Sequence, residues 1–109
     1  MKSIFVGLLA TLTLVAPAVA RAAPATPTVT INNFAYSPKV LTITAGTTVR
    51  FINRDTEAHT VTYTGPEKFD SAGLDTGDSW THTFTKPGTY AYFCTLHPFM
   101  KGTIVVTAR

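Results

Sequence analysis

The chain has 109 residues, of which 45% are hydrophobic and 14% are charged, and this length suits one small domain. A single cysteine excludes a disulfide scaffold within the chain. The twelve aromatic residues and the many β-branched residues argue against disorder. The formal charge of +3 is lower than nucleic-acid-binding modules usually carry, so we expect no nucleic-acid partner.

The first 22 residues have the pattern of a secretory signal peptide. Lys2 precedes an uncharged, mostly apolar run over residues 4–16, and small-x-small triplets then end at Ala20 and Ala22. An uncleaved membrane anchor is the alternative, but a spanning helix needs ~20 apolar residues and this run is shorter. We therefore expect cleavage, with no membrane insertion of the mature chain.

Cleavage after Ala22 leaves seven basic and six acidic residues, so the mature chain is nearly neutral. Its expected location is the periplasm. Residues 23–28 contain two prolines and are expected to form a flexible lead-in to one domain over residues 29–109. In an oxidising compartment the lone Cys94 must be buried, paired between chains or bound to a metal.

Beyond the lead-in, hydrophobic residues recur with a period of two rather than 3.6. Short segments rich in Val, Ile, Thr and Phe, bounded by Gly and Pro turns, predict strands, and no segment has a convincing helical stripe. Seven or eight such strands favour an all-β sandwich. The predicted strands are Thr28–Phe34, Val40–Thr44, Thr47–Asn53, Thr60–Thr64, a short piece near Lys68–Ser71, Ser79–Thr85, Thr89–Cys94 and Gly102–Thr107.

Alternation along a strand assigns side chains to faces. Tyr90, Tyr92 and Cys94 share one face, which we take as the core side. His82 also falls at an inward position. It could be a second metal ligand or a pH sensor, but no other ligand residues cluster near it, so we expect a partly buried histidine with one backbone hydrogen bond.

Four residues form a candidate metal site. Cys94, His97 and Met100 follow the strand that ends at Cys94 with the spacing Cys-x2-His-x2-Met, and His59 lies upstream at a predicted loop-to-strand junction. One thiolate, two imidazoles and one thioether are the donor set of blue copper sites. Thiolate and thioether favour Cu(I), whereas imidazole binds both oxidation states, so such a site can pass electrons with little rearrangement.

The same residues allow other interpretations. A buried cysteine is usually a small hydrophobe, and a lone methionine is usually core filler. Structural zinc usually recruits two or more cysteines. A cysteine hydrolase needs a histidine and a third orienting group beside the nucleophile, whereas Cys94 follows an apolar strand and has no glycine-rich oxyanion loop. Combined with the export signal, the sandwich pattern and His59, the cluster favours one copper ion.

Residues 29–107 resemble the cupredoxins, the small type I (blue) copper proteins, and among them the amicyanin and plastocyanin-like group. The resemblance implies a Greek-key β-sandwich. The short two-and-two ligand loop, with Pro-Phe before the methionine, is specific to the amicyanin-like branch. The segments that carry the resemblance are Phe34–Pro38, Ala45–Val49, Glu57–Val61, Pro87–Cys94 and His97–Gly102.

The resemblance implies that His59, Cys94 and His97 are the strong ligands of a type I copper ion and that Met100 is the weak axial ligand. The family often has asparagine directly after the first histidine, whereas this chain has Thr60. We expect the Thr60 hydroxyl to bond either the backbone beside Cys94 or the hydroxyl of the following threonine.

Other residues have structural roles that the resemblance implies. Gly46 and Gly88 are expected in turns, and Tyr90 is expected to make the tyrosine-corner hydrogen bond common in such sandwiches. The His97 imidazole is expected to protrude through an apolar ring that includes Pro98 and Phe99, while His59 is expected to be buried.

The resemblance implies a soluble, exported electron carrier that cycles between Cu(I) and Cu(II), acts as a monomer and is not an enzyme. Amicyanins serve an amine dehydrogenase and a c-type cytochrome, so a dehydrogenase donor and a c-type cytochrome acceptor are the expected kinds of partner. Two alternatives are a copper-binding or trafficking protein that stores or delivers the metal, and a sandwich used for adhesion. Copper carriers tend to be Met-rich or His-rich, and only one methionine follows the predicted signal peptide.

Overall fold

A computed structural model describes residues 3–4, 6–16 and 25–109 of the chain. The described residues contain nine strands and no helix, and the strands form two sheets, which confirms the predicted all-β sandwich. The strands are β1 (Thr28–Asn32), β2 (Ala35–Ser37), β3 (Val40–Thr44), β4 (Thr47–Asn53), β5 (Thr62–Tyr63), β6 (Phe69–Asp70), β7 (Ser79–Phe84), β8 (Gly88–Phe93) and β9 (Lys101–Thr107).

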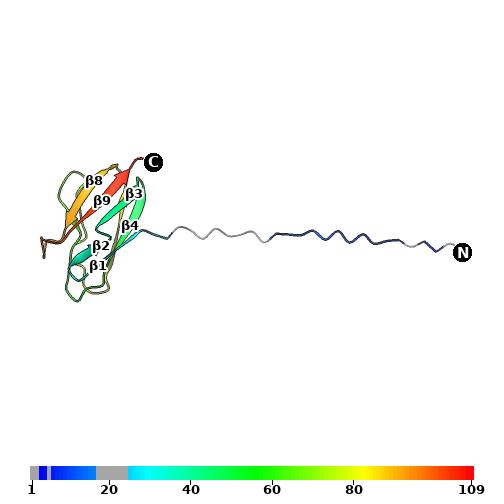
Figure 1. The fold of residues 1–109 in the computed structure, drawn as a ribbon, viewed down its shortest axis with the longest axis horizontal. Coiled ribbons are helices and arrows are strands. Elements are labelled where there is room, and N and C mark those ends of the chain that lie inside the picture. The colour runs from blue at the N-terminus through cyan, green and yellow to red at the C-terminus, as the bar shows by residue number, and fades with distance from the viewer. Residues whose placement is uncertain (1–2, 5, 17–24) are drawn as a thin grey trace.

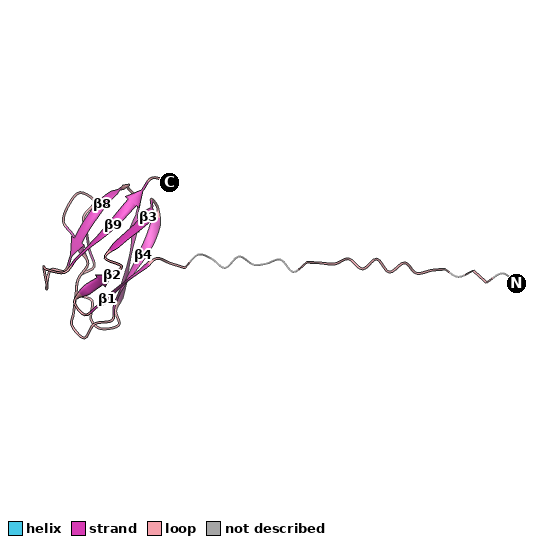
Figure 2. Ribbon diagram, viewed as in Figure 1, coloured by secondary structure: helices cyan, strands magenta, loops and turns pink. Residues whose placement is uncertain are grey.

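The chain crosses repeatedly between the two sheets (Figures 1 and 2). One sheet has the order β2-β1-β4-β7 and the other has the order β3-β9-β8-β5-β6. Two pairings are parallel, β1 with β4 and β3 with β9, and the remaining pairings are antiparallel. This crossing brings the segment after β4 and the loop after β8 together, although they are far apart in the sequence.

The core lies between the sheets and is filled by the alternating inward side chains of the strands. Along β8, Tyr90 and Tyr92 are buried while Ala91 is exposed, as the period of two predicts. Aromatic rings meet edge to face, with the Tyr36 and Tyr92 centroids 4.7 Å apart. The apolar cluster continues to Cys94, which directly follows β8, so the core itself fixes the position of the thiol.

Two close contacts explain particular residues of this core. The Tyr90 hydroxyl donates a hydrogen bond to the Lys86 carbonyl at 2.7 Å, which confirms the predicted tyrosine corner. Gly102, at the start of β9, lies under the Tyr92 phenol, and a β-carbon there would collide with that phenol. A larger residue at position 102 would therefore displace a buried ring beside the ligand loop.

The first predicted strand is wrong at its end. Thr28–Phe34 was expected to be continuous, but β1 ends at Asn32 and a two-residue turn leads into β2. Asn33 and Phe34 both have positive φ, 49° and 56°. Such a turn is usually marked by Asn-Gly, so Asn-Phe gives no turn signal. The extra hairpin raises the number of strands in the described residues to nine, against the seven or eight expected.

Two smaller predictions also need correction. The predicted strand Thr60–Thr64 is reduced to β5, because the Thr60 amide donates to the Cys94 sulfur rather than to a neighbouring strand. Gly88, expected in a turn, is already the first residue of β8, whereas Gly46, with φ of 92°, lies in the predicted turn between β3 and β4.

The segment before β1 does not test the signal peptide. Its described apolar side chains are exposed, for example Ile4 at 85% and Leu8 at 91%. No helix in the described part of the chain is long and apolar enough to span a membrane. The predicted cleavage site after Ala22 and residues 23–24 of the lead-in lie outside the described residues, so export stays a prediction.

Candidate metal centre

The four residues of the predicted site come from two segments of the sandwich. His59 lies between β4 and β5, Cys94 directly follows β8, and His97 and Met100 lie in the loop that leads into β9. The loop is closed by two backbone hydrogen bonds, one from the Cys94 amide to the Met100 carbonyl at 3.2 Å and one from the Met100 amide to the His97 carbonyl at 2.9 Å. The short ligand loop therefore folds back on itself, and β9 begins directly after Met100.

The structure brings three donor atoms together. His59 Nδ1 and His97 Nδ1 lie 3.2 Å apart, and the Cys94 Sγ lies 3.8 Å from each of them. Bonds from a metal to nitrogen and sulfur are ~2.0–2.3 Å long, so these distances suit three ligands around a single ion. In the described part of the chain this is the one cluster of His, Cys, Asp and Glu that could hold a metal ion.

Burial differs among the four residues. His59 and Cys94 are fully buried, Met100 is 2% exposed, and His97 is partly exposed. Met100 belongs to the apolar core cluster together with Cys94. A buried thiol and a buried thioether are the soft ligands that favour Cu(I), and the buried imidazole also suits copper.

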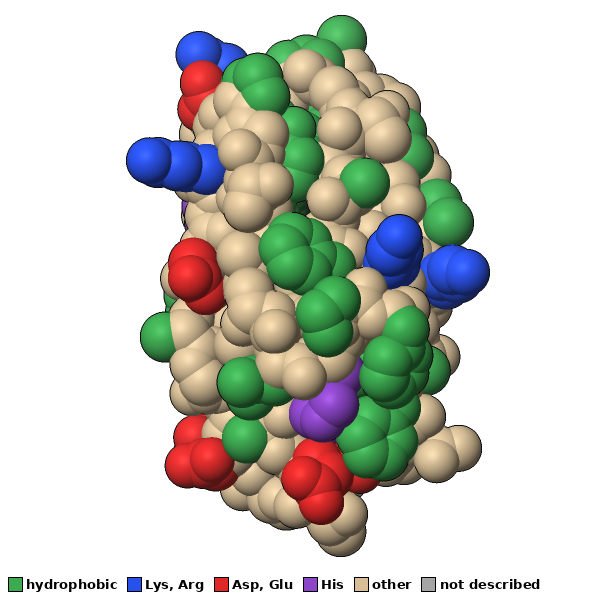
Figure 3. All heavy atoms as spheres, turned by 90° about the vertical axis from the view of Figure 1, so that its left-hand side faces the viewer, with side chains coloured by type: hydrophobic (Ala, Val, Ile, Leu, Met, Phe, Trp, Pro, Cys, Tyr) green, Lys and Arg blue, Asp and Glu red, His purple; other side chains and the backbone are tan. Residues whose placement is uncertain are grey.

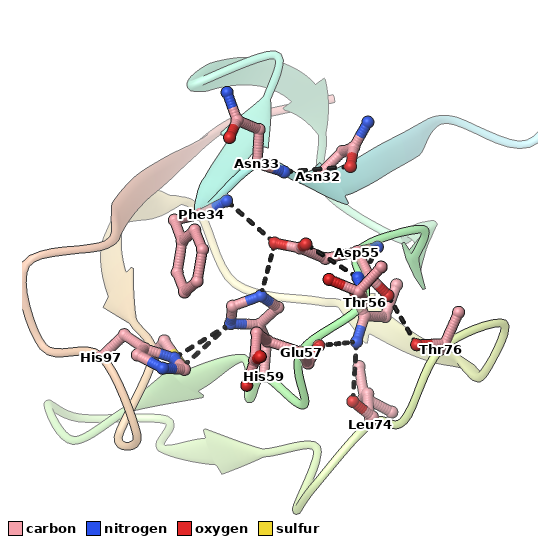
Figure 4. Close-up of polar contacts among 12 residues, drawn as sticks. Asn32, Asn33, Phe34, Asp55, Thr56, Glu57, His59, Leu74, Thr76 and His97 are labelled. Carbon is pink, nitrogen blue, oxygen red and sulfur yellow. Dashed lines mark hydrogen bonds and ion pairs between the residues drawn. The ribbon is translucent and has the colours of Figure 1, made fainter.

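Asp55 orients the buried histidine. Its Oδ2 lies 2.9 Å from His59 Nε2 and also accepts the Phe34 amide at 2.9 Å (Figure 4). This contact leaves the other ring nitrogen of His59, Nδ1, facing the Cys94 sulfur. The hydrogen bond from the Phe34 amide, followed by that from His59, lowers the pKa of Asp55 to about 2, so the carboxylate is charged at neutral pH. Carboxylates that bind the far nitrogen of a metal-ligating histidine fix its orientation.

The backbone that carries His59 is held by a buried amide. Asn53 Nδ2 donates to the Glu57 and Leu74 carbonyls, each at 2.8 Å, and Asn53 Oδ1 accepts the Asp55 amide at 2.9 Å. His59 and Leu74 also exchange backbone hydrogen bonds at 3.1 and 2.8 Å. The position of His59 therefore does not depend on a metal.

Thr60 links the two ligand-bearing segments as predicted. Its hydroxyl accepts the Thr95 amide at 2.9 Å and lies 3.2 Å from the Thr95 hydroxyl, so both expected contacts are present. Its amide donates to the Cys94 sulfur at 3.3 Å, and its carbonyl accepts the Tyr36 hydroxyl. Burial, followed by the nearby Cys94, raises the pKa of Tyr36, so this phenol stays a donor.

The surface around His97 is apolar. Phe34, Leu96 and Phe99 are exposed by 38%, 55% and 70%. Figure 3 shows hydrophobic side chains gathered above and beside a histidine at this end of the molecule, with acidic side chains below it. Phe34 was not expected here, because the turn that places it was not recognised.

His82 lies apart from this centre. Its half-buried ring stacks on Trp80, with centroids 5.2 Å apart, and contacts Phe69 at 4.7 Å. Burial lowers its pKa. Partial burial was predicted, but the expected hydrogen bond is replaced by aromatic contacts, since the ring makes no hydrogen bond with any residue that the structure describes.

Sequence reasoning missed Asn53 and Asp55. Both lie just before His59, and Asp55 stands four residues before it. An Asn-x-Asp turn that directly follows an apolar strand and precedes a candidate ligand is a signal that could have found them. Their role depends on contacts with Phe34 and Leu74, which are distant in the sequence.

The fold and these four residues define a blue copper protein, and the chain belongs to the cupredoxin-like domain family, which matches residues 4–106. It is 34% identical over 80 residues to amicyanin from Paracoccus versutus, covering 70% of this chain and 61% of that protein. It is 35% identical over 81 residues to plastocyanin from Prochlorothrix hollandica, covering 65% of this chain and 62% of that protein. The chain thus spans less than two thirds of the length of these relatives.

Solved structures agree with this membership. The structure of an amicyanin variant in its reduced state superposes with a TM-score of 0.73 at 33% identity, covering 81% of this chain and 88% of that one. His59, Cys94, His97 and Met100 are arranged as a type I copper site, and the cofactor is one copper ion.

Proposed function

We propose that the protein is a soluble electron carrier, exported to the periplasm, in which His59, Cys94 and His97 are the strong ligands of one copper ion and Met100 is the weak axial ligand. The observation that carries the proposal is the convergence of two imidazole nitrogens and one sulfur within 3.8 Å of one another, in a buried site with one histidine at the surface.

Bound copper supplies a one-electron couple between Cu(I) and Cu(II). The protein holds the donors in one arrangement for both states. Asp55 fixes the ring of His59, the Thr60 amide donates to the Cys94 sulfur, and the core packs around Met100. A frame with so many fixed contacts favours electron transfer over release of the metal, because little has to move when the charge changes.

The exposed end of the site suits contact with other redox proteins. Leu96 and Pro98 flank His97 in the chain, Phe99 contacts its ring, and all three expose apolar side chains. A contiguous exposed apolar patch is typical of interaction sites. It lets a partner approach the imidazole closely while water is excluded. We propose a dehydrogenase as electron donor and a c-type cytochrome as acceptor, with the protein acting as a monomer that performs no enzymatic reaction of its own.

The test is the colour and the redox behaviour of the purified protein loaded with Cu(II). An intense blue absorption that bleaches on reduction and returns on oxidation is expected, together with one-electron exchange with a c-type cytochrome. Colourless Cu(I) binding with fast transfer of the metal to an acceptor would instead indicate copper storage or delivery. A protein that takes up no copper would contradict both functions.

Export is tested separately, by N-terminal sequencing of the protein recovered outside the cytoplasm of a bacterial host. The sequence is expected to begin between Arg21 and Ala25, because the small-x-small triplets end there. A mature protein that begins at Met1 would contradict the signal peptide but not the copper site.

A further inference from the structure

The turn between β1 and β2 has a strained backbone at Phe34, whose ring contacts both histidines of the metal centre. Asn33 and Phe34 have φ of 49° and 56°. A two-residue hairpin turn with positive φ at both positions is usually built by Asn-Gly, and a bulky residue at positive φ is a genuine outlier. Glycine at position 34 would form the turn without this strain, so the turn itself does not require a phenyl ring.

The ring of Phe34 lies across the two histidines (Figure 4). Its centroid is 5.4 Å from that of His59 and 5.1 Å from that of His97, and the interplanar angle is 85° in both contacts. The side chain is 38% exposed. It therefore covers the pair of imidazoles on one side and meets solvent on the other.

Asp55 couples the strained turn to the buried histidine. The same oxygen, Oδ2, accepts the Phe34 amide and contacts His59 Nε2, each at 2.9 Å. One carboxylate thus fixes both the backbone that carries the ring and the imidazole that the ring covers. Backbone strain persists where surrounding contacts over-determine it, and it is concentrated at functional sites.

We propose that Phe34 is a positioning residue that retains the copper: its ring keeps the two imidazoles in place and slows release of the metal to competing ligands. The strained turn is the cost of placing the ring there. This inference rests on the proposed copper function. The inference predicts different causes for two measurable properties. Copper retention depends on the ring of Phe34, whereas the stability of the copper-free fold also depends on the backbone conformation at position 34.

The experiment compares Phe34→Ala with Phe34→Gly, which both lack the ring. The purified protein is loaded with copper, reduced to Cu(I) and mixed with excess bathocuproine disulfonate, and the rate of chelate formation is measured. Both variants are expected to release copper roughly tenfold faster than the wild type, or more, because loss of a residue that orients metal ligands typically costs about 10–100-fold in metal affinity. Without copper, the Tm of Phe34→Gly is expected to lie roughly 4–8 °C above that of Phe34→Ala, because glycine accepts a positive φ.

Two further variants serve as controls. Phe34→Tyr keeps an aromatic ring and is expected to restore slow release. Ala72 has φ of 58° on the exposed loop between β6 and β7, so Ala72→Gly relieves similar strain away from the ring. It is expected to raise Tm and to leave the release rate unchanged.

The outcomes separate this inference from the function on which it rests. Release rates that follow Tm across the Phe34 variants would show a merely structural role and overturn the inference, as would wild-type rates in both the alanine and the glycine variant. If the wild-type protein is blue but the variants give either of these results, the proposed function is retained and only the inference about Phe34 is overturned. A wild-type protein that takes up no copper would overturn the proposed function itself.

Discussion

The two histidines of the centre are held in very different ways. His59 is fully buried, its ring is fixed by Asp55, and its backbone exchanges hydrogen bonds with Leu74. His97 is partly exposed, and its ring lies among the apolar rings of Phe34 and Phe99, with centroids 5.1 and 6.2 Å away. One histidine is held by polar contacts inside the protein, the other by packing at its surface.

This difference suits the proposed role in electron transfer, in which one ligand must stay fixed and the other must be reachable. The polar contacts of His59 are made entirely within the chain, so they keep one ligand in place whether or not the metal is bound. The apolar surroundings of His97 leave its edge available to a partner. Removal of a polar contact on the buried side should therefore disturb the site more than a change on the exposed side.

The largest expected effect comes from replacing Cys94, whose Sγ lies 3.8 Å from the Nδ1 atoms of both histidines. Cys94→Ser is expected to abolish the intense blue absorption, because copper–thiolate bonding creates it. Met100→Gln is expected to keep a copper site with a modified spectrum, since the axial ligand only tunes the metal. Visible spectra of the copper-loaded proteins provide the test. Blue colour in the serine variant would contradict the assignment of Cys94.

The sequence was sufficient to predict the parts of the centre that follow from local patterns. Period-two alternation placed Tyr90, Tyr92 and Cys94 on the core side, and the short ligand loop with His59 upstream gave the four site residues. The contacts of the Thr60 hydroxyl were also predicted, because Thr60 directly follows the first ligand histidine, where the family often has an asparagine that joins the two ligand loops.

What could not be predicted depends on contacts between distant segments. The Asn33-Phe34 turn lacks glycine, and it exists because Asp55 and the two histidines hold it. The carboxylate of Asp55 was missed for the same reason. A sequence pattern shows local conformational preference, whereas these residues adopt an unfavourable local conformation in exchange for tertiary contacts.

The next prediction breaks the polar support of the buried histidine. Asp55→Asn keeps the side-chain shape but replaces one accepting oxygen with a donating NH2 and removes the negative charge. Whichever way the amide is turned, either the Phe34 amide and His59 or the Thr56 amide loses its acceptor. Copper affinity is expected to fall by roughly 10–100-fold, measured by competition with a chelator of known affinity.

Glu57→Gln is the matched control for this change. It removes an exposed carboxylate two residues further along the same segment, so it alters the net charge equally. It is expected to bind copper like the wild type. An equal loss of affinity in both variants would mean that general electrostatics, rather than the contact with His59, explains the effect.

A smaller effect is expected where the two ligand segments are joined. Thr60→Ala removes the acceptor of the Thr95 amide and is expected to lower the free energy of unfolding by about 1–3 kcal/mol. Thr60→Ser keeps the hydroxyl and is expected to lose much less. Guanidinium unfolding of the copper-free proteins measures the difference. If the serine and alanine variants lose equal stability, the methyl group rather than the hydrogen bond supports the link.

The smallest expected effect concerns His82, the histidine that lies apart from the metal centre. Burial against Trp80 and Phe69 lowers the pKa of His82 below its ordinary value of 6.5, because the ring loses water that would stabilise its charged form. As the pH falls below 6.5, His82 therefore takes up a proton in the unfolded chain before it does so in the folded chain. The free energy of unfolding decreases with falling pH until the pH lies below the folded-state pKa. Well above pH 6.5 the histidine is neutral in both states and the contribution vanishes.

His82→Gln removes this titration and keeps a neutral polar side chain. The charged residues Glu67, Lys68 and Lys86 line the same surface pocket as His82 and are unchanged in the variant. The copper-free wild type is expected to lose more stability than His82→Gln between pH 7.5 and 5.5, measured by guanidinium midpoints. The two proteins differ only at position 82, so the contributions of all other residues cancel in the comparison. Parallel pH profiles would show that the loss of stability in acid does not originate at this aromatic cluster.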